Sequence, residues 1–166
     1  MNNGNIKIRK SKPSDKKYIL LLMQEFVEYY WPINPFKKEN VDSKKTATYH
    51  TNKMIKYTKN HDGVVYVAED NGNLVGFVGI GLKKQPYEDT LEEIPMTYGY
   101  ISAVFVTKSY RGSGIGQKLL SKAEQHFISK KCTHVILHVY DYNAQSHEFY
   151  KKLGYMDWNI KMIKTL

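Results

Sequence analysis

The stretch that indicates the fold of this chain reads Val104-Phe105-Val106-Thr107-Lys108-Ser109-Tyr110-Arg111-Gly112-Ser113-Gly114-Ile115-Gly116-Gln117. An apolar run with β-branched residues stops after Val106, three glycines follow at alternate positions, and a helical pattern then begins. Glycine lets a backbone turn sharply and approach a ligand closely, and the first turn of a helix offers unpaired N–H groups. The pattern is typical of a phosphate or pyrophosphate site. The simpler alternative is a glycine-rich strand-to-helix turn without a ligand.

Two common phosphate-binding motifs do not match this stretch. A P-loop requires Gly-Lys-Ser or Gly-Lys-Thr, and the sequence contains neither. A dinucleotide-binding fingerprint counted from Gly112 needs a third glycine where Gln117 stands. What remains is the pattern Arg111-x-x-Gly114-x-Gly116, and we refer to residues Arg111–Gln117 as the cradle.

Length and composition indicate one folded domain. With 166 residues, of which 42% are hydrophobic, the chain is expected to form a single domain over residues 1–166 with a substantial core. We expect no membrane partner, because no apolar run approaches the roughly 18 residues of a membrane span. The N-terminus lacks the apolar segment of a secretory signal, and the single cysteine, Cys132, is typical of a reducing compartment. A cytoplasmic location is therefore expected.

The formal net charge of +9 raises the question of nucleic-acid binding. The lysines are scattered as pairs, and no run of five or six basic residues occurs. A solvated basic surface is the favoured interpretation, partly because a phosphate-rich cofactor itself favours positive potential. Nucleic-acid binding is kept as a less favoured alternative, which predicts steeply salt-dependent binding to DNA.

Hydrophobic periodicity predicts alternating strands and helices. The expected strands cover residues 6–9, 64–68, 74–80, 98–107, 133–140 and 156–162, and the expected helices cover 14–31, 43–59, 114–130 and 143–153. The first helix is expected to have Ser14 as its N-cap and to end at Trp31-Pro32. Asn71-Gly72 between two apolar runs predicts a β-hairpin. This order predicts an α/β domain with a mixed, mostly antiparallel central sheet flanked by helices.

A second motif lies downstream and reads Asn143-Ala144-Gln145-Ser146-His147-Glu148-Phe149-Tyr150-Lys151-Lys152-Leu153-Gly154-Tyr155. Together with Arg111-x-x-Gly114-x-Gly116, it resembles the GNAT acetyltransferase superfamily, whose pyrophosphate signature is Gln/Arg-x-x-Gly-x-Gly/Ala. In that superfamily a strand leads to an asparagine, and a short helix carries a tyrosine seven residues further on, followed by Leu-Gly-Phe or Leu-Gly-Tyr. The resemblance covers roughly residues 5–166, is strongest over 98–155, and implies a GNAT fold.

The resemblance implies acetyl-CoA, or a related acyl-CoA, as the donor, and it names residues that would bind it. Val104 and Val106 would pair through their backbones with the pantetheine arm, and a main-chain N–H of Phe105–Val106 would polarise the thioester carbonyl. Asn143 would bond the pantetheine or position the next helix. The backbone amides of the cradle would bind the pyrophosphate, and its residues are Arg111, Gly112, Ser113, Gly114, Ile115, Gly116 and Gln117.

The resemblance also implies that Tyr150 protonates the departing CoA thiolate. A phenol has a reference pKa near 10 and stays protonated at neutral pH, so it can act as a general acid. The alternative is that Tyr150 is an ordinary aromatic residue on an apolar helix face, which is a serious alternative in a chain with 14 tyrosines.

The group that removes the proton from the attacking amine is left open. A primary ammonium is only about 0.1% deprotonated at pH 7. Alternation predicts that Tyr98, Tyr100 and Ser102 face the same side as Val104 and Val106, and none of them is a carboxylate. Proton removal is therefore expected to run through water. Tyr98, Tyr100, Glu25 or Glu28 would order that water, and solvent alone is a further possibility.

The acceptor is expected to be an amine, which belongs to a small amine or polyamine, an aminoglycoside-like compound, or a peptide. An acidic and aromatic lining suits a cationic amine, and residues of the first helix would border the acceptor cleft: Glu25, Glu28, Tyr29, Tyr30 and Trp31. The acidic residues at 88–93 would add to the negative electrostatic potential at that cleft. The alternative is that these glutamates form a solvated helix face and the aromatic residues belong to the core.

No metal site is expected. His134 and His138 lie four residues apart on a predicted strand, and this spacing separates them by roughly 13 Å. We predict an acyl-CoA-dependent N-acetyltransferase that transfers acetyl directly in a ternary complex, with Tyr150, Tyr98 and Glu25 as candidate catalytic residues. The alternatives are a non-catalytic acyl-CoA-binding or sensing module and the nucleic-acid-binding domain. A homodimer is expected from the resemblance alone.

Overall fold

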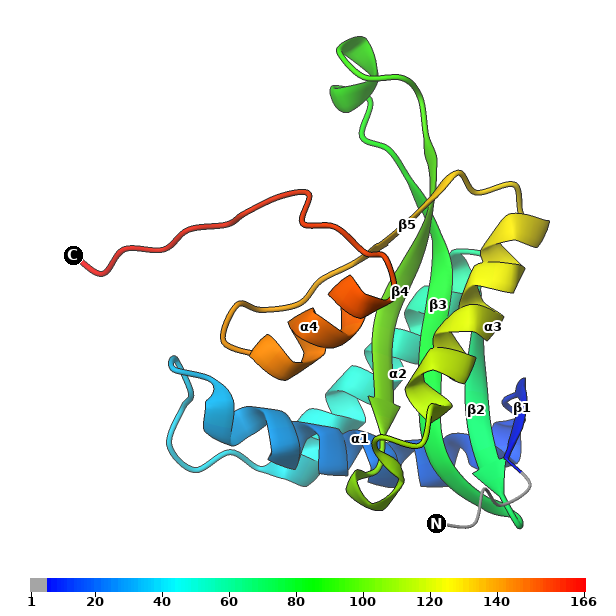
Figure 1. Cartoon of the computed structure of the whole chain (residues 1–166). Coiled ribbons are helices and arrows are strands. Elements are labelled where there is room, and N and C mark those ends of the chain that lie inside the picture. Colours follow the sequence, from blue (N-terminus) through cyan, green and yellow to red (C-terminus); the bar gives the residue numbers. More distant parts are fainter. Residues whose placement is uncertain (1–5) are drawn as a thin grey trace.

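The computed structural model describes residues 6–166 and places their strands in one sheet, in the order β1-β2-β3-β4-β5 (Figure 1). The strands are β1 (Lys7–Lys10), β2 (Val64–Asp70), β3 (Asn73–Lys84), β4 (Thr97–Val106) and β5 (His134–Leu137). The helices are α1 (Lys16–Tyr30), α2 (Ser43–Asn60), α3 (Ile115–Ser129) and α4 (Ala144–Lys152). Neighbouring strands are antiparallel except β4 and β5, which are parallel. The predicted α/β fold with a mixed, mostly antiparallel sheet flanked by helices is therefore confirmed.

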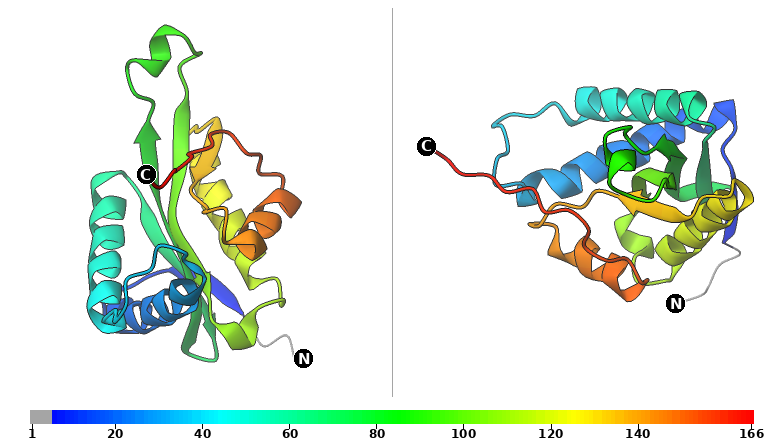
Figure 2. Two further views of the ribbon diagram at one scale, coloured as in Figure 1. Left: turned by 90° about the vertical axis from the view of Figure 1, so that its left-hand side faces the viewer. Right: turned by 90° about the horizontal axis from the view of Figure 1, so that it is seen from above.

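Helices cover both faces of the sheet. α1 and α2 lie on one face, and α3 and α4 lie on the other (Figure 2). No helix among residues 6–166 is both long and apolar enough to span a bilayer.

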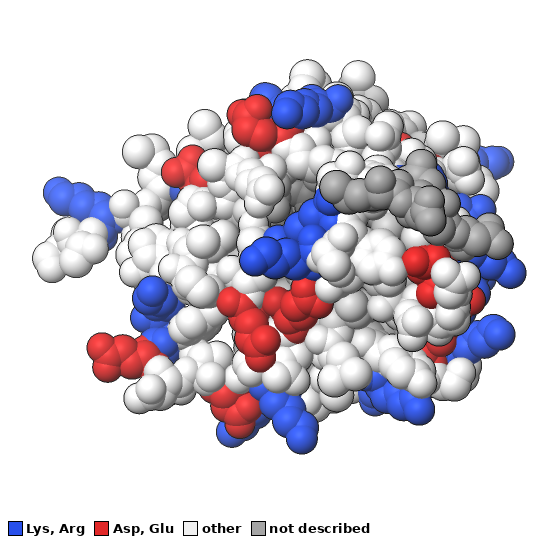
Figure 3. Space-filling view, turned by 60° about the horizontal axis from the view of Figure 1, so that its bottom comes forward, with Lys and Arg blue, Asp and Glu red and all other residues white. Residues whose placement is uncertain are grey.

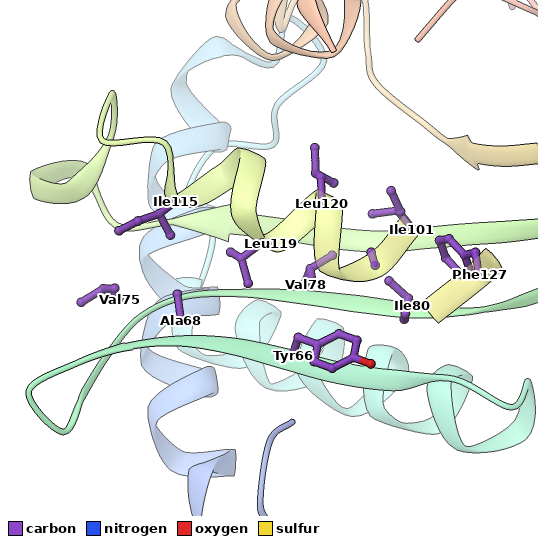
Figure 4. Close-up of a cluster of buried hydrophobic side chains, with 11 residues drawn as sticks. Tyr66, Ala68, Val75, Val78, Ile80, Ile101, Ile115, Leu119, Leu120 and Phe127 are labelled. Atoms are coloured by element: carbon purple, nitrogen blue, oxygen red, sulfur yellow. The ribbon is translucent and has the colours of Figure 1, made fainter. Parts of the chain in front are cut away.

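The face under α3 holds the larger of two apolar clusters (Figure 4). The amphipathic helix buries its apolar stripe against the sheet, and this stripe consists of Ile115, Leu119, Leu120, Ala123 and Phe127. The sheet contributes side chains such as Val78, Ile80 and Ile101. Each such side chain, when fully buried, contributes roughly 1.5–3 kcal/mol. This packing holds the start of α3 at the end of β4.

The opposite face holds a second cluster beneath α1 and α2. α1 buries Ile19, Leu22, Met23 and Val27, whereas Phe26, Tyr29 and Tyr30 are only partly buried. The predicted N-cap at Ser14 is wrong, because Pro13–Asp15 form a 3-10 turn and α1 begins at Lys16 without a side-chain cap.

Asp15 is instead buried in an ion-pair network with β1 and β2. Its carboxylate accepts hydrogen bonds from Arg9 Nη1 at 2.6 Å and from the Lys12 N–H at 2.7 Å. Arg9 Nε donates to Glu69 Oε2 at 2.6 Å. The hydrogen bonds from Arg9 lower the pKa of Asp15 below its usual value. The network ties the start of α1 to the edge of the sheet.

The predicted hairpin and the predicted final strand have different outcomes. β2 and β3 pair around Asn71 and Gly72, which have positive φ values of 47° and 85°, as expected for this turn. The strand predicted at 133–140 is limited to His134–Leu137. The strand predicted at 156–162 is wrong, because residues 155–166 have no regular structure. Alternating apolar residues define one face of a strand, but a strand also needs a partner edge, and residues 155–166 pair with no strand within the described chain.

Candidate active site

The cradle links the end of β4 to the start of α3 through a 3-10 turn at Lys108–Tyr110. Gly112 and Gly114 have φ values of 77° and 81°, in the left-handed region where side chains are strained. A Cβ built at either glycine would have no described atom within 4 Å. The backbone therefore turns sharply here and leaves open space above two glycines.

The N-terminus of α3 lies at this space, and its first amides have no helical partner among the described residues. Gly114 occupies the N-cap position and supplies no side-chain cap, and the first helical hydrogen bond runs from the Lys118 N–H to the Gly114 carbonyl at 3.0 Å. The preceding amides, from Ile115 to Gln117, have no partner within the helix. A shallow hollow of about 490 Å³ beside Gly114 and Gln117 is bordered by Lys118 and Lys122. Free N–H groups, the helix dipole and lysines all favour an anion.

Two side chains anchor the segment that leads into the cradle. Arg111 Nε donates to the Val106 carbonyl at 3.1 Å, and its guanidinium lies 4.0 Å from the centroid of the Tyr29 ring. Glu25 of α1 accepts hydrogen bonds from Thr107 Oγ1 at 2.6 and 2.8 Å and from the Lys108 N–H at 2.9 Å. The cradle is thus held in place from the α1 side of the sheet.

β4 parts from β5 just before the cradle. The two strands pair only between Tyr98–Ile101 and His134–Leu137, so within the described chain residues 102–106 of β4 have no strand partner on the β5 side. Unpaired backbone groups at such an edge are available to a ligand. The backbones of Val104 and Val106, predicted to pair with a pantetheine arm, lie in this unpaired segment.

A β-bulge overturns the prediction that Tyr98, Tyr100 and Ser102 share a face with Val104 and Val106. Gly79 pairs with Ala103 and Ile80 with Ile101, so Ser102 is an extra residue in β4. Such an insertion reverses the alternation of side chains. Val104 and Val106 pack in the α3 cluster, whereas Phe105 packs against α1. Tyr100 contacts Tyr57 of α2, and Ser102 donates to the Gly79 carbonyl at 2.8 Å.

α4 lies directly against the first turn of α3. A Cβ at Gly116 would be 3.2 Å from Phe149 Cζ, so this glycine allows the two helices to approach closely. Asn143 caps α4 by accepting a hydrogen bond from the Ser146 N–H at 3.4 Å. Asn143 is therefore the N-cap of the helix that follows it, and its two predicted roles at the pantetheine site stay predictions. The second motif is thus brought next to the cradle.

Tyr150 occupies a partly buried position on α4. Its ring lies 5.5 Å from that of Phe149 and 5.8 Å from that of Tyr155 and packs against the α3 cluster. Burial raises the pKa of Tyr150 to about 12. Its phenol is therefore in the neutral form at neutral pH.

The end of α1 meets the β5–α4 connection through tyrosines. Tyr29 donates to Gln145 Oε1 at 2.8 Å, and the hydroxyls of Tyr30 and Tyr142 are hydrogen-bonded to each other. Tyr142 also stacks on Tyr140 at 5.1 Å between centroids. These contacts join the two sides of the gap between β4 and β5 and form an aromatic wall there.

The predicted acidic residues of the acceptor side are spread over the molecule. Glu28 accepts hydrogen bonds from Gln24 and Ser43, which lower its pKa and tie α1 to α2. The acidic loop at 88–93 lies at the opposite end of β3 and β4 from the cradle (Figure 1). The loop is therefore distant from the cradle, and its predicted contribution to the acceptor site stays a prediction. Figure 3 shows basic and acidic side chains interspersed on the cradle end of the molecule.

Tyr98 lies away from the cradle. It is 3% exposed, its ring lies 6.3 Å from that of His134 and 5.6 Å from that of Trp158, and its buried hydroxyl has no hydrogen-bond partner within the described chain. Four residues of strand separate it from Ser102, a distance of about 13 Å. The catalytic role predicted for Tyr98 stays a prediction, as does that of Glu25.

Three contributors to the site were not predicted from sequence. They are Thr107, which binds Glu25, Phe149, which packs on Gly116, and Tyr142, which binds Tyr30. Each acts through a residue far away in the chain, so no local spacing indicates it. The aromatic composition of 140–150 was the only available signal.

Comparison with known proteins identifies the family. A profile of the Acetyltransferase (GNAT) family matches residues 23–155. The chain therefore belongs to the GNAT acetyltransferase family.

Relatives and solved structures agree with this. An uncharacterised N-acetyltransferase of Methanocaldococcus jannaschii is 28% identical over 110 residues, which are 66% of this chain and 63% of that protein. The thialysine N-epsilon-acetyltransferase of Bos taurus is 36% identical over 58 residues, which are 35% of this chain and 34% of that protein. The match thus spans less than two thirds of the length of these curated relatives. A predicted acetyltransferase from Clostridium acetobutylicum, solved with acetyl-CoA, has the same fold, with a TM-score of 0.67, 20% identity and 96% coverage of each chain.

Proposed function

We propose that the protein transfers the acetyl group of acetyl-CoA directly to a primary amine, with both substrates bound at once. The observation that carries this proposal is the placement of a partly buried tyrosine, Tyr150, on the helix that packs against the cradle. A phosphate-binding backbone alone suits many ligands. A phosphate-binding backbone next to a proton donor suits a reaction in which an anion leaves.

The residues of the site fit the chemical groups of acetyl-CoA. Open space above Gly112 and Gly114 and the free amides of Ile115–Gln117 suit the pyrophosphate. The unpaired edge of β4 at Val104–Val106 supplies backbone groups for the pantetheine amides and one N–H for the thioester carbonyl. A fixed N–H donor that faces a developing oxyanion contributes a few kcal/mol to such a reaction.

The transfer step conserves protons and electrons as follows. The amine nitrogen forms a bond to the thioester carbon, the carbon–sulfur bond breaks, and its electron pair leaves on sulfur. Tyr150 donates its proton to this thiolate, and the proton lost by the amine returns to the phenolate through water. Because burial raises the pKa of Tyr150 to about 12, the phenol is in its acid form throughout the neutral range.

Removal of the amine proton is assigned to water. Both oxygens of Glu25 are engaged by Thr107 and Lys108, so we propose that Glu25 holds the cradle entrance and acts on the reaction only by positioning. The acceptor is proposed to be a cationic amine, since the aromatic wall of Tyr30, Tyr140 and Tyr142 can bind a cation through its ring faces. The relative that acetylates thialysine shows that an amine of this type is used within the family.

The test is CoA release from acetyl-CoA across a panel of polyamines, aminoglycosides, amino acids and basic peptides. We expect acceptor-dependent release, and Tyr150→Phe should lower kcat about 10-fold or more while the Kd for acetyl-CoA changes little. Tyr155→Phe is the matched control, because it removes the hydroxyl of a neighbouring, partly buried tyrosine that binds Glu124. Equal turnover of Tyr150→Phe and wild type would remove the acid role. Tight binding of acetyl-CoA without release for any amine would favour the non-catalytic binding module.

A further inference from the structure

His138 lies where β5 parts from β4. The last paired residues of the two strands are Ile101 and Leu137, and the chain beyond Leu137 leaves β4 and runs to α4 (Figure 1). A pantetheine arm that starts at the cradle would run back along the unpaired edge of β4 toward this point. Val104 is two residues of strand, about 7 Å, from Ser102, which follows the last pair on β4. The thioester would therefore lie close to His138.

The ring of His138 lies on the face of the sheet that α1 and α2 cover. It contacts the ring of Tyr100 at 5.8 Å between centroids, and the ring of Tyr100 contacts that of Tyr57 of α2 at 5.3 Å. Tyr150 packs with the α3 cluster on the other face. An imidazole and a phenol thus lie on opposite sides of the gap in which the thioester would lie.

The imidazole of His138 is available to accept a proton. It is exposed, and its ring nitrogens have no hydrogen-bond partner among residues 6–166, whereas those of His61 and His134 bond Tyr57 and Thr133. Histidine is the side chain whose charge ordinarily changes between pH 5 and 8. An imidazole at this position can therefore accept a proton from a substrate near neutral pH.

The elements packed around His138 supply no carboxylate to hold its ring as a cation. The sequences of β3, β4 and α2 contain neither aspartate nor glutamate. The charged and titratable groups around the ring of Tyr100 are Tyr57, His61, which stacks on Tyr57, and Lys83, whose Nζ lies 5.7 Å from the centroid of Tyr100. The positive charge of Lys83 favours the neutral imidazole, which is the form that accepts a proton.

The aromatic wall lies on the same segment of chain. Tyr140 and Tyr142 follow His138 at alternate positions, and both contact the ring of Tyr30 of α1. An ammonium group bound to these ring faces would lie beside His138 and beside the gap between β4 and β5.

We propose that His138 removes the first proton of the bound ammonium through one water molecule, which leaves a neutral amine to attack the thioester. The N–H bond of the ammonium breaks as its proton passes to the water oxygen, and a proton of that water passes to the imidazole nitrogen. The exposed imidazolium then releases its proton to solvent. The second proton, which the amine loses on attack, returns to the phenolate of Tyr150 as proposed above. This inference rests on the proposed acetyl transfer and names the group that activates its water.

The test is the pH dependence of kcat, measured as acetylated product from acetyl-CoA and the fastest acceptor of the amine panel. For wild type, we expect kcat to rise through an inflection between pH 5 and 8 and then to level off. For His138→Gln, we expect kcat to be about 10- to 100-fold lower at pH 7 and to keep rising toward pH 9, because the ammonium must then lose its proton to solvent alone. His134→Gln, four residues earlier on the same strand, is the matched control and should follow wild type.

His138→Glu separates a role in proton transfer from a role in structure. A carboxylate also accepts a proton but titrates at lower pH, so the inflection should move down and kcat at pH 6 should exceed that of His138→Gln. Isothermal titration with CoA and far-UV circular dichroism should be unchanged in every variant. A plateau that survives in His138→Gln, or a loss of equal size at every pH, would overturn the inference and leave acetyl transfer intact. Absence of acceptor-dependent CoA release by wild type would overturn both.

Discussion

Glycine has two different roles at the start of α3. At Gly114 the backbone has a φ of 81° and the space where a side chain would lie is open. At Gly116 the same space is limited by Phe149. The first glycine is required by the conformation of the backbone and leaves room for a ligand, whereas the second is required by the contact between two helices.

Replacement of Gly114 by valine is expected to weaken binding of CoA by about tenfold or more, because a branched side chain would occupy the space above the free amides. Gly72→Val is the control, since Gly72 has a similar φ of 85° and open space but lies in the β2–β3 turn. Both variants should lose about 1–3 kcal/mol of unfolding free energy through backbone strain. Isothermal titration with CoA and urea unfolding measure the two effects. Normal affinity in Gly114→Val would refute the cradle assignment.

The spacing between Asn143 and Tyr150 was sufficient to predict from the sequence that both residues belong to one short helix. Both lie where the motif predicts, on one short helix with Asn143 at its N-cap. The raised pKa of Tyr150 was not predictable, because it depends on burial by α3 and by the neighbouring aromatic rings.

At the scale of elements, side-chain alternation in the sequence did not predict correctly which residues of β4 share a face. Alternation placed Tyr98 and Val104 on one face, but the extra residue at Ser102 moves them to opposite faces. A bulge arises from the pairing of β4 with β3, and neither strand alone carries a signal for it. The helices were predicted more closely, because the 3.6-residue period of α3 is a property of its own sequence.

The contact between α3 and α4 predicts an effect on turnover without loss of stability. Gly116→Ala would place a methyl group 3.2 Å from Phe149 Cζ and push α4, with Tyr150, away from the cradle. We expect a several-fold lower kcat, while thermal stability is preserved because alanine in a helix is favoured over glycine by about 1 kcal/mol. The double variant with Phe149→Leu, which makes room for the methyl group, should recover part of the lost turnover. A kcat unchanged by Gly116→Ala would show that this contact does not position Tyr150.

At the scale of the whole molecule, the network of Arg9, Asp15 and Glu69 joins β1, the start of α1 and β2. Asp15 is 8% exposed in its side chain and has a lowered pKa. Its contribution to stability is therefore complete above the pKa of about 3.8 expected in the unfolded chain and is lost as the pH falls through the lower value in the folded protein.

Asp15→Asn is accordingly expected to lower the free energy of unfolding by about 2 kcal/mol at pH 7. The difference from wild type should shrink at pH 3 and below, since the wild type then begins to lose the same interaction. Urea unfolding at the two pH values measures this. Asp62→Asn, which breaks the exposed pair with Lys130, is the control and should have little effect at either pH. A difference that is constant between the two pH values would contradict the role given to Asp15.

The sequence by itself determined the features that depend on neighbouring residues. These are the helices, the Asn71-Gly72 hairpin, the glycine cradle and the spacing from Asn143 to Tyr150, each of which follows from local backbone conformation or periodicity. Only the tertiary structure decided the bulge at Ser102, the binding of Glu25 to Thr107, the packing of Phe149 on Gly116, and the absence of a strand partner for residues 156–162 among residues 6–166. These features depend on atoms that come together from distant parts of the chain. A local pattern specifies which face of a segment is apolar, but the surface that covers this face exists only after folding.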